Sequence, residues 1–204
     1  MRHHTSSILS LHRTAVLGGL LALAAPSVAP AAEPVLSLTA FAVNMSGVGR
    51  TGRTETLQIA IERWSTDEER AMLIDTLVEK SSDKLLDAVQ KIKPRAGYIR
   101  TTTSLGWDIQ FARETDLPSG GKRIVFATDR PMGFREMRNS NRSADYEFML
   151  CEIRLGPDGK GEGKLAGGAK ISYDKDAKKI EIENYGQEPV RLTQVVTDKK
   201  KEKK

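Results

Sequence analysis

Apolar and polar side chains alternate in short runs along most of this chain, and this pattern restricts what the chain can fold into. Leu57, Ile59 and Ile61 alternate with polar neighbours, for example, and comparable runs flank the turns at 118–121 and 157–159. A period of two is typical of a β-strand with one buried face. Because most runs are joined by only a few residues, neighbouring strands are predicted to be antiparallel.

The period-two runs predict eight or nine strands. They lie at 35–43, 55–64, 97–111, 124–128, 146–155, 169–173, 179–185 and 190–196. An antiparallel sheet of this size usually curls, so we expect a barrel-like structure.

Two helices are predicted between residues 66 and 93, after the second strand. Ser65 with Glu68, or Thr66 with Glu69, matches a capping box, and apolar residues then follow at helical spacing until Pro94. We expect the helical hairpin to lie against one opening or face of the sheet. The predicted fold class is therefore α+β, mostly β, with a two-helix insertion.

Residues 1–31 have the pattern of a signal peptide. Arg2 and Arg13 precede an apolar run at 15–25, and Ala29-Pro30-Ala31 offers small residues for cleavage. The run is shorter than the roughly 20 residues that a membrane-spanning helix needs. We therefore expect an exported chain, periplasmic or extracellular, with no transmembrane segment after cleavage. Residues 32–197 are expected to form a single β-rich domain, and 198–204 a disordered Lys-rich tail.

Removing the predicted signal peptide removes His3, His4 and His12, which are all the histidines of the chain. The remaining chain cannot activate a nucleophile with imidazole or bind a metal through it. It has a single cysteine, Cys151, so it forms no internal disulfide and no thiolate cluster. The neighbours of Cys151 predict a buried, inert thiol. We expect no cofactor and no metal.

The basic charge of the chain resides at its two ends. Basic and acidic residues are equal in number between residues 32 and 197, and the excess lies in the first 31 and the last seven residues. Net charge is therefore no argument for a nucleic-acid partner.

A long irregular segment, 129–145, supplies the candidate ligand-binding residues. Connections of this length are uncommon in compact domains and are often functional. The segment is rich in arginine and contains no lysine; guanidinium groups bind carboxylates or phosphates bidentately and stack on aromatic rings. The candidates are Arg130, Arg135, Arg138, Arg142 and Phe134. The alternative is that these arginines pair with nearby acids, namely Asp129, Glu136, Asp145 and Glu147.

Three other features are weaker candidates. Residues 47–52 match G-x-G-x-x-G, but a strand pattern follows where a nucleotide-binding fold needs a helix, so a hairpin loop is expected. Asp108 and Asp129 are the main option for paired-carboxylate catalysis, although carboxylates on the outside of strands are usually solvated. Asp174-Lys175-Asp176 is expected to be a turn and not a calcium loop.

Three segments resemble a family of exported bacterial proteins, a domain of unknown function without assigned activity. These are YIRTTTSLGWDI, ATDRPMGF and ENYGQEPVRLTQV. The resemblance implies export and a single domain and brings no catalytic residues.

Three functions remain open from the sequence. The first is an exported, non-enzymatic binding module for an anionic or amphipathic ligand, held by the Arg-rich segment. The second is a cell-envelope interaction or structural protein, whose partner is an envelope protein instead of a small ligand. The third is a His-independent carboxylate hydrolase that depends on Asp108. We favour the binding module.

Overall fold

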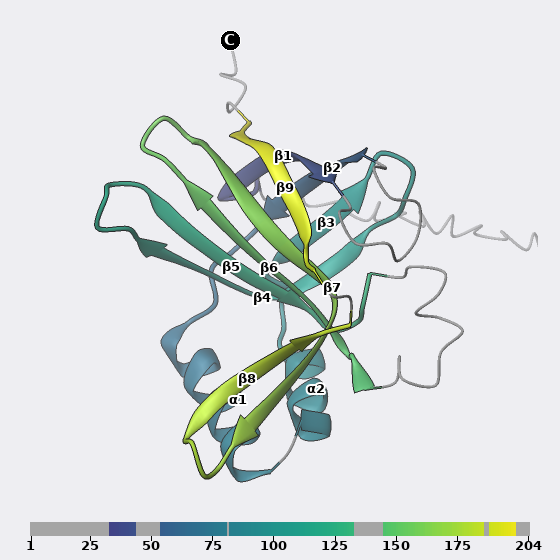
Figure 1. The fold of residues 1–204 in the computed structure, drawn as a ribbon, viewed down its shortest axis with the longest axis vertical. Coiled ribbons are helices and arrows are strands. Elements are labelled where there is room, and N and C mark those ends of the chain that lie inside the picture. Colours follow the sequence, from purple (N-terminus) through teal and green to yellow (C-terminus); the bar gives the residue numbers. More distant parts are fainter. Residues whose placement is uncertain (1–32, 44–53, 81, 133–144, 186–187, 199–204) are drawn as a thin grey trace, which may run out of the picture. The chain divides into compact units, whose positions relative to one another are not determined.

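The structure is a computed structural model that describes residues 33–43, 54–80, 82–132, 145–185 and 188–198. Within these ranges the chain forms strands and two helices (Figure 1). In chain order they are β1 (Leu36–Val43), β2 (Thr54–Ile61), α1 (Asp67–Glu79), α2 (Ser82–Lys91), β3 (Gly97–Thr101), β4 (Trp107–Asp116), β5 (Lys122–Thr128), β6 (Phe148–Leu155), β7 (Lys160–Asp174), β8 (Lys179–Asn184) and β9 (Val190–Thr197).

Eight of the strands close into an antiparallel barrel. The pairing follows the chain from β1 to β6, continues from β6 to β7 and from β7 to β9, and ends where β9 pairs with β1. The ninth strand, β8, pairs with β7 within the described part of the chain. The predicted fold class is confirmed, including the two helices after the second strand.

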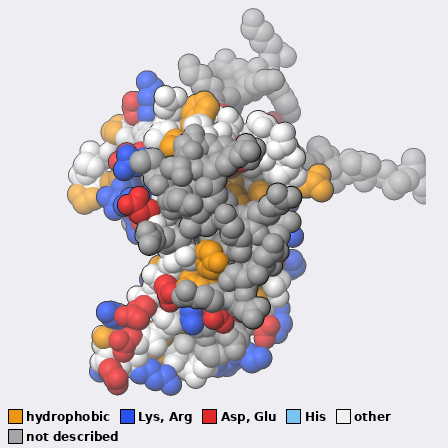
Figure 2. Space-filling model, turned by 45° about the vertical axis from the view of Figure 1, so that its right-hand side comes forward, with side chains coloured by type: hydrophobic (Ala, Val, Ile, Leu, Met, Phe, Trp, Pro, Cys, Tyr) orange, Lys and Arg blue, Asp and Glu red, His pale blue; other side chains and the backbone are white. Residues whose placement is uncertain are grey.

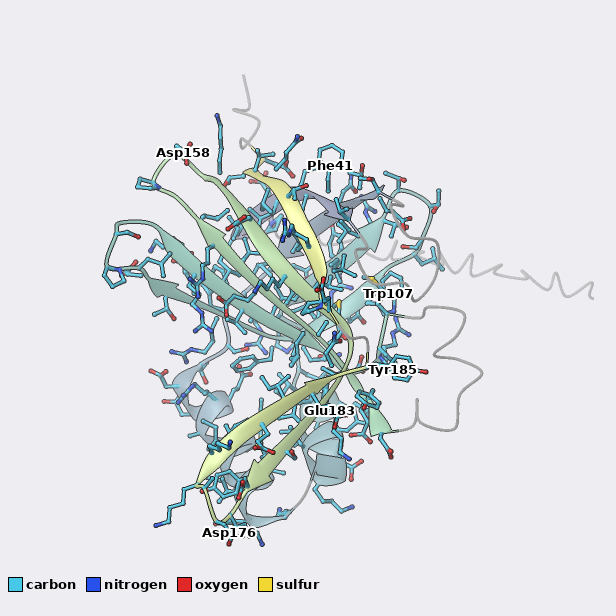
Figure 3. All side chains as sticks on the ribbon, viewed as in Figure 1. Phe41, Trp107, Asp158, Asp176, Glu183 and Tyr185 are labelled. Atoms are coloured by element: carbon cyan, nitrogen blue, oxygen red, sulfur yellow. The ribbon has the colours of Figure 1, made fainter. Side chains whose placement is uncertain are left out.

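The longest strand, β7, belongs to two parts of the fold. Its first residues, as far as Leu165, pair with β9, while 161–169 pair with β6. From Ala169 to Asp174 it pairs instead with β8. In Figure 3, Asp158 and Asp176 mark the turns at the two ends of β7 and lie far apart. The sequence predicted only 169–173 of this strand.

Two glycines explain why the first half of β7 gives a weak strand signal. A Cβ on Gly161 would lie 1.9 Å from the carbonyl oxygen of Arg154, and one on Gly163 would lie 2.6 Å from that of Glu152. Glycine lowers strand propensity, but here it lets β6 and β7 approach closely. The close approach closes the barrel at this seam.

Apolar side chains from every strand of the barrel fill its interior. Phe126, Met149 and Ile153 are among the side chains with almost no exposure. The same cluster contains Leu38, Leu57, Ile59, Ile61, Ile99, Ile109, Ile124, Cys151, Leu165 and Leu192. An eight-stranded barrel is just wide enough for side chains to fill it. Its interior is therefore a packed core.

A bulge in β4 changes which residues face this core. The pairing register of β4 with β5 shifts between Ile109 and Phe111. Ile109 and Ala112 therefore both join the barrel core, whereas Phe111 packs against the second cluster, outside the barrel. The sequence predicts that Leu105, Trp107, Ile109 and Phe111 share one face. This is wrong for Phe111 because an extra residue reverses the alternation, and Leu105 is fully exposed.

The two helices pack against β4 and β7 and take part in a second apolar cluster. Thr66 and Glu69 form the capping box of α1, which confirms one of the two predicted pairs. Leu73 and Leu77 of α1 pack with residues of α2 and with Phe148 and Ala169. The cluster also includes Leu85, Val89 and Ile92, with Ile171 and Tyr173 of β7 at its edge. The helical hairpin thus lies beside the part of β7 that pairs with β8 (Figure 1).

The last described residue, Asp198, is bound to the first strand. Asp198, which the sequence assigns to the tail, is bound to β1: its amide donates to the oxygen of Ser37 at 2.9 Å. Thr39 also donates to its carboxylate at 2.9 Å. Residues 1–32 and 199–204 lie outside the described ranges.

None of the described helices has the length and apolar character needed to cross a membrane.

Candidate functional site: a groove on the outer wall of the barrel

The predicted Arg-rich site is described only in part. Arg130 is exposed directly after β5, and its Nη2 donates to the carbonyl oxygen of Gly106 at 3.3 Å. Phe134, Arg135, Arg138 and Arg142 lie in 133–144, outside the described residues. Their role as a ligand site therefore stays a prediction.

Asp108 is held in an ion-pair network. Arg95 places Nη1 2.5 Å from Asp108, and its Nε and Nη2 bind the carboxylate of Glu62 at 3.0 and 2.8 Å. The Arg95 guanidinium also lies over the ring of Tyr98, 5.3 Å from its centroid. The hydrogen bonds that Arg95 donates to Glu62, and then to Asp108, raise the pKa of Arg95. Asp108 therefore joins β4 to β2 through Arg95.

Two other sequence features have structural roles. Cys151 is buried, as predicted, and burial raises the pKa of its thiol. Asp174 accepts hydrogen bonds from the amides of Asp176 and Ala177, both at 2.9 Å, so this segment is the predicted turn. The glycine pattern at 47–52 lies outside the described residues. The strand β2 follows it, as the sequence predicts.

A groove of about 750 Å³ lies on the outer wall of the barrel. Its lining comes from β5, β6, β7 and β9, with one residue of β8. The side chains that line the groove include Arg123, Val125, Leu150, Glu152, Arg154, Glu162, Lys164, Ala166, Ile182 and Arg191. Pockets of 300–1,000 Å³ are typical of small-molecule sites.

The strand register arranges these side chains in rows across the wall. Arg123 lies opposite Arg154, and Arg154 lies opposite Glu162. Two residues further along the strands, Val125, Glu152, Lys164 and Arg191 form the next row. Leu150 and Ala166 form a third row. Charged groups therefore occupy one end of the groove and apolar groups the other.

One carboxylate serves two arginines in the charged rows. Glu152 accepts from Arg123 Nη2 at 2.6 Å and from Arg154 Nε at 2.9 Å. The guanidinium of Arg123, and then that of Arg154, hold the pKa of Glu152 below its usual range. Glu152 is therefore ionised at neutral pH and forms ion pairs with both arginines.

Lys164 and Arg191 form a pair of like charges. They are directly opposite each other in the register of β7 and β9, and both are exposed. Within the described residues, no ion pair joins either of them to a carboxylate. Like charges at directly opposed positions of a sheet are destabilising. Lys164 is also directly opposite Glu152 on β6, but the carboxylate of Glu152 is bound by Arg123 and Arg154. An anion between Lys164 and Arg191 would offset the repulsion between them and bind to both.

The described surface has a mixed charge pattern. On the described part of the face in Figure 2, blue and red side chains are intermixed. This pattern agrees with the equal numbers of basic and acidic residues between 32 and 197.

Sequence reasoning missed this groove entirely. The residues of the charged rows come from four strands, and Lys164 and Arg191 become neighbours only through the pairing of β7 with β9. The only local signal was the run Lys160–Lys164, in which charged residues alternate with glycines. That pattern shows which side chains share a face but not which strand lies beside them.

Comparisons with known proteins identify no relative of this chain. Neither protein-family profiles, nor curated proteins, nor solved structures give a significant match to the chain. In the described part of the chain, no three His, Cys, Asp or Glu side chains are grouped so that they could hold a metal ion. The fold and the site together define a closed antiparallel barrel with a groove on its outer wall that is charged at one end and apolar at the other.

Proposed function

We propose that this chain is an exported, non-enzymatic binding module that holds an anionic ligand in the groove on the outer wall of the barrel. The observation that carries the proposal is the pair of like charges formed by Lys164 and Arg191 at the groove. An ammonium and a guanidinium bind a carboxylate or phosphate through charge-assisted hydrogen bonds. Glu152 is already bound by Arg123 and Arg154.

The filled barrel supports a site on the outer wall. Large side chains such as Phe126 and Met149 have almost no exposure and occupy the interior. A ligand inside the barrel would have to displace this core. The outer groove can accept a ligand without any such change.

Export is the second part of the proposal and rests on residues 1–31. Their charged start, short apolar run and small residues at 29–31 are those of a signal peptide. The absence of histidine after residue 12 favours binding over the commonest forms of hydrolysis.

The intact mass of the exported protein, taken from its own host, tests both parts. We expect a chain that begins at Ala32 and carries extra mass under native conditions, and this mass should disappear on denaturation. An uncleaved N-terminus would contradict export. A bare monomer, or a clean multiple of its mass, would favour the envelope-interaction alternative.

Paired variants locate the ligand. In Lys164→Ser/Arg191→Ser we expect the extra mass to be lost, because both cations at the groove are gone. Lys160→Ser/Lys179→Ser removes the same charge at two exposed positions outside the groove lining, and it should retain the ligand. Retention in both double variants would contradict a site at the groove and direct attention to the Arg-rich segment.

A further inference from the structure

We infer that the ligand is a single-chain amphipath whose anionic head lies between Lys164 and Arg191 and whose alkyl chain lies over the apolar end of the groove. The inference rests on the proposed function and specifies its ligand class. It is carried by the order of side chains along the strands.

The groove changes from charged to apolar in one direction. The row that contains Lys164 and Arg191 is two residues away from the row formed by Leu150 and Ala166. Two residues along a strand span about 7 Å. Leu150 and Ala166 in turn pack against the second apolar cluster, which includes Phe148 and residues of both helices. A head bound at the cations therefore has apolar surface on one side of it.

An exposed isoleucine completes the apolar end. Ile182 of β8 lines the groove and is 61% exposed. Its cross-strand neighbour is Ile171, which packs at the edge of the second apolar cluster. A ligand that covers Ile182 removes apolar area from water and gains binding energy in proportion to that area.

The charges at the other end disfavour a free polyanion. Glu162 lies opposite Arg154, and Glu152 stands in the same row as Lys164. A chain of phosphates that followed the strands would meet both carboxylates. A single anionic group between Lys164 and Arg191 avoids Glu162, which belongs to the neighbouring row.

The small size of the apolar end favours one chain over two. Leu150, Ala166 and Ile182 form this end, and the rows beyond it carry charges. The core beneath it is packed, so a ligand lies on the wall. One alkyl chain is enough to cover three side chains, so the occupant is a monomeric amphipath and not the surface of a bilayer.

Calorimetric titration of the purified exported protein tests the inference. The probes are dodecyl phosphate and dodecanoate, each below its critical micelle concentration. Inorganic phosphate serves as the anionic head without a chain, and dodecyl maltoside serves as an amphipath without a charge. We expect at least one of the two anionic amphipaths to bind at least tenfold more tightly than inorganic phosphate or dodecyl maltoside. Which head binds more tightly distinguishes a phosphate from a carboxylate ligand.

A matched pair of variants isolates the alkyl chain. Ile182→Ser should weaken binding of the anionic amphipath about tenfold, since losing part of one isoleucine contact is worth about that factor. Its binding of inorganic phosphate should not change. Ile180→Ser is the control, because Ile180 is 46% exposed on the same strand but does not line the groove. It should leave both affinities unchanged.

The outcomes separate this inference from the proposed function. If Lys164→Ser/Arg191→Ser abolishes binding of phosphate, but the amphipaths bind no better than phosphate and Ile182→Ser has no effect, the site takes a small anion and the inference is wrong. If no anionic probe binds, or the double variant binds as well as the parent, the proposed function fails as well. Binding to anionic vesicles without binding to monomers would also overturn the inference.

Discussion

Single carboxylates hold this fold together at the points where elements meet. Glu69 caps α1 through Thr66 and binds Arg63 through two hydrogen bonds of 2.9 Å each. Both side chains are only 22% exposed, so the pair is shielded more than a surface ion pair. The hydrogen bonds from Arg63, together with that from the Thr66 amide, lower the pKa of Glu69.

This lowered pKa predicts a pH-dependent effect of Glu69→Gln. A carboxyl whose pKa is lowered in the folded state stabilises the fold above its ordinary pKa of 4.5 and loses this contribution as the pH falls through the folded-state value. We expect the variant to lose about 1 kcal/mol of unfolding free energy at pH 7. The difference should shrink below pH 4.5 and vanish once Glu69 is protonated in the parent.

Urea unfolding between pH 7 and pH 3 measures this difference. Asp75→Asn is the control, because Asp75 is exposed on the same helix. A loss in Glu69→Gln that stays constant over the whole range would show that packing or geometry, and not charge, is responsible.

At the scale of elements, local patterns predicted most strands, both helices and the antiparallel pairing of sequential strands, but not the register of the strands or the pairing of β9 with β1 and β7. The capping residues of α1 and the alternation in β2 are properties of neighbouring residues, so the sequence displays them. The bulge between Ile109 and Phe111 depends on how β4 fits β5, and the length of β7 depends on close contact with β6. Lys164 and Arg191 became a candidate site only after the register of β7 with β9 was known.

The close contact of β6 with β7 predicts the effect of Gly161→Ala. The added Cβ would meet the backbone of Arg154, which cannot move without disturbing the strand pairing. We expect a loss of about 1–3 kcal/mol, the usual cost of overpacking. Thermal unfolding measures it. Gly156→Ala is the control, since the nearest neighbour of its added Cβ is a side-chain oxygen of Asp158 at 3.0 Å and not a strand backbone.

A comparable loss in both glycine variants would contradict this account. It would show that the conformational freedom of glycine, and not the approach of the two strands, decides stability at the seam. A loss confined to Gly161→Ala would identify the seam as the place where the barrel closes.

At the scale of the whole molecule, closure makes the barrel interior inaccessible. Every strand of the barrel has two paired neighbours, and the interior is filled by the main apolar cluster. Cys151 belongs to this cluster and is only 2% exposed. Its thiol therefore reports on the integrity of the entire barrel.

Thiol labelling tests this closure. Because burial raises the pKa of Cys151, we expect no reaction with a disulfide reagent at pH 8 under native conditions. In urea, reaction should begin at the concentration at which the fold unfolds by circular dichroism. Rapid labelling in native buffer would show that the strands around β6 separate locally without global unfolding.

The course of β7 has a consequence for the proposed ligand binding. One unbroken strand provides Lys164 and Ala166 on the barrel wall and then pairs with β8, which provides Ile182. Between these two parts, the register of β7 with β6 shifts at Gly167 and Gly168, so the relative position of the two sides of the groove depends on this bulge. A ligand that contacts both sides, as proposed, would hold the bulge in one geometry, and the conformational entropy lost there would reduce its affinity.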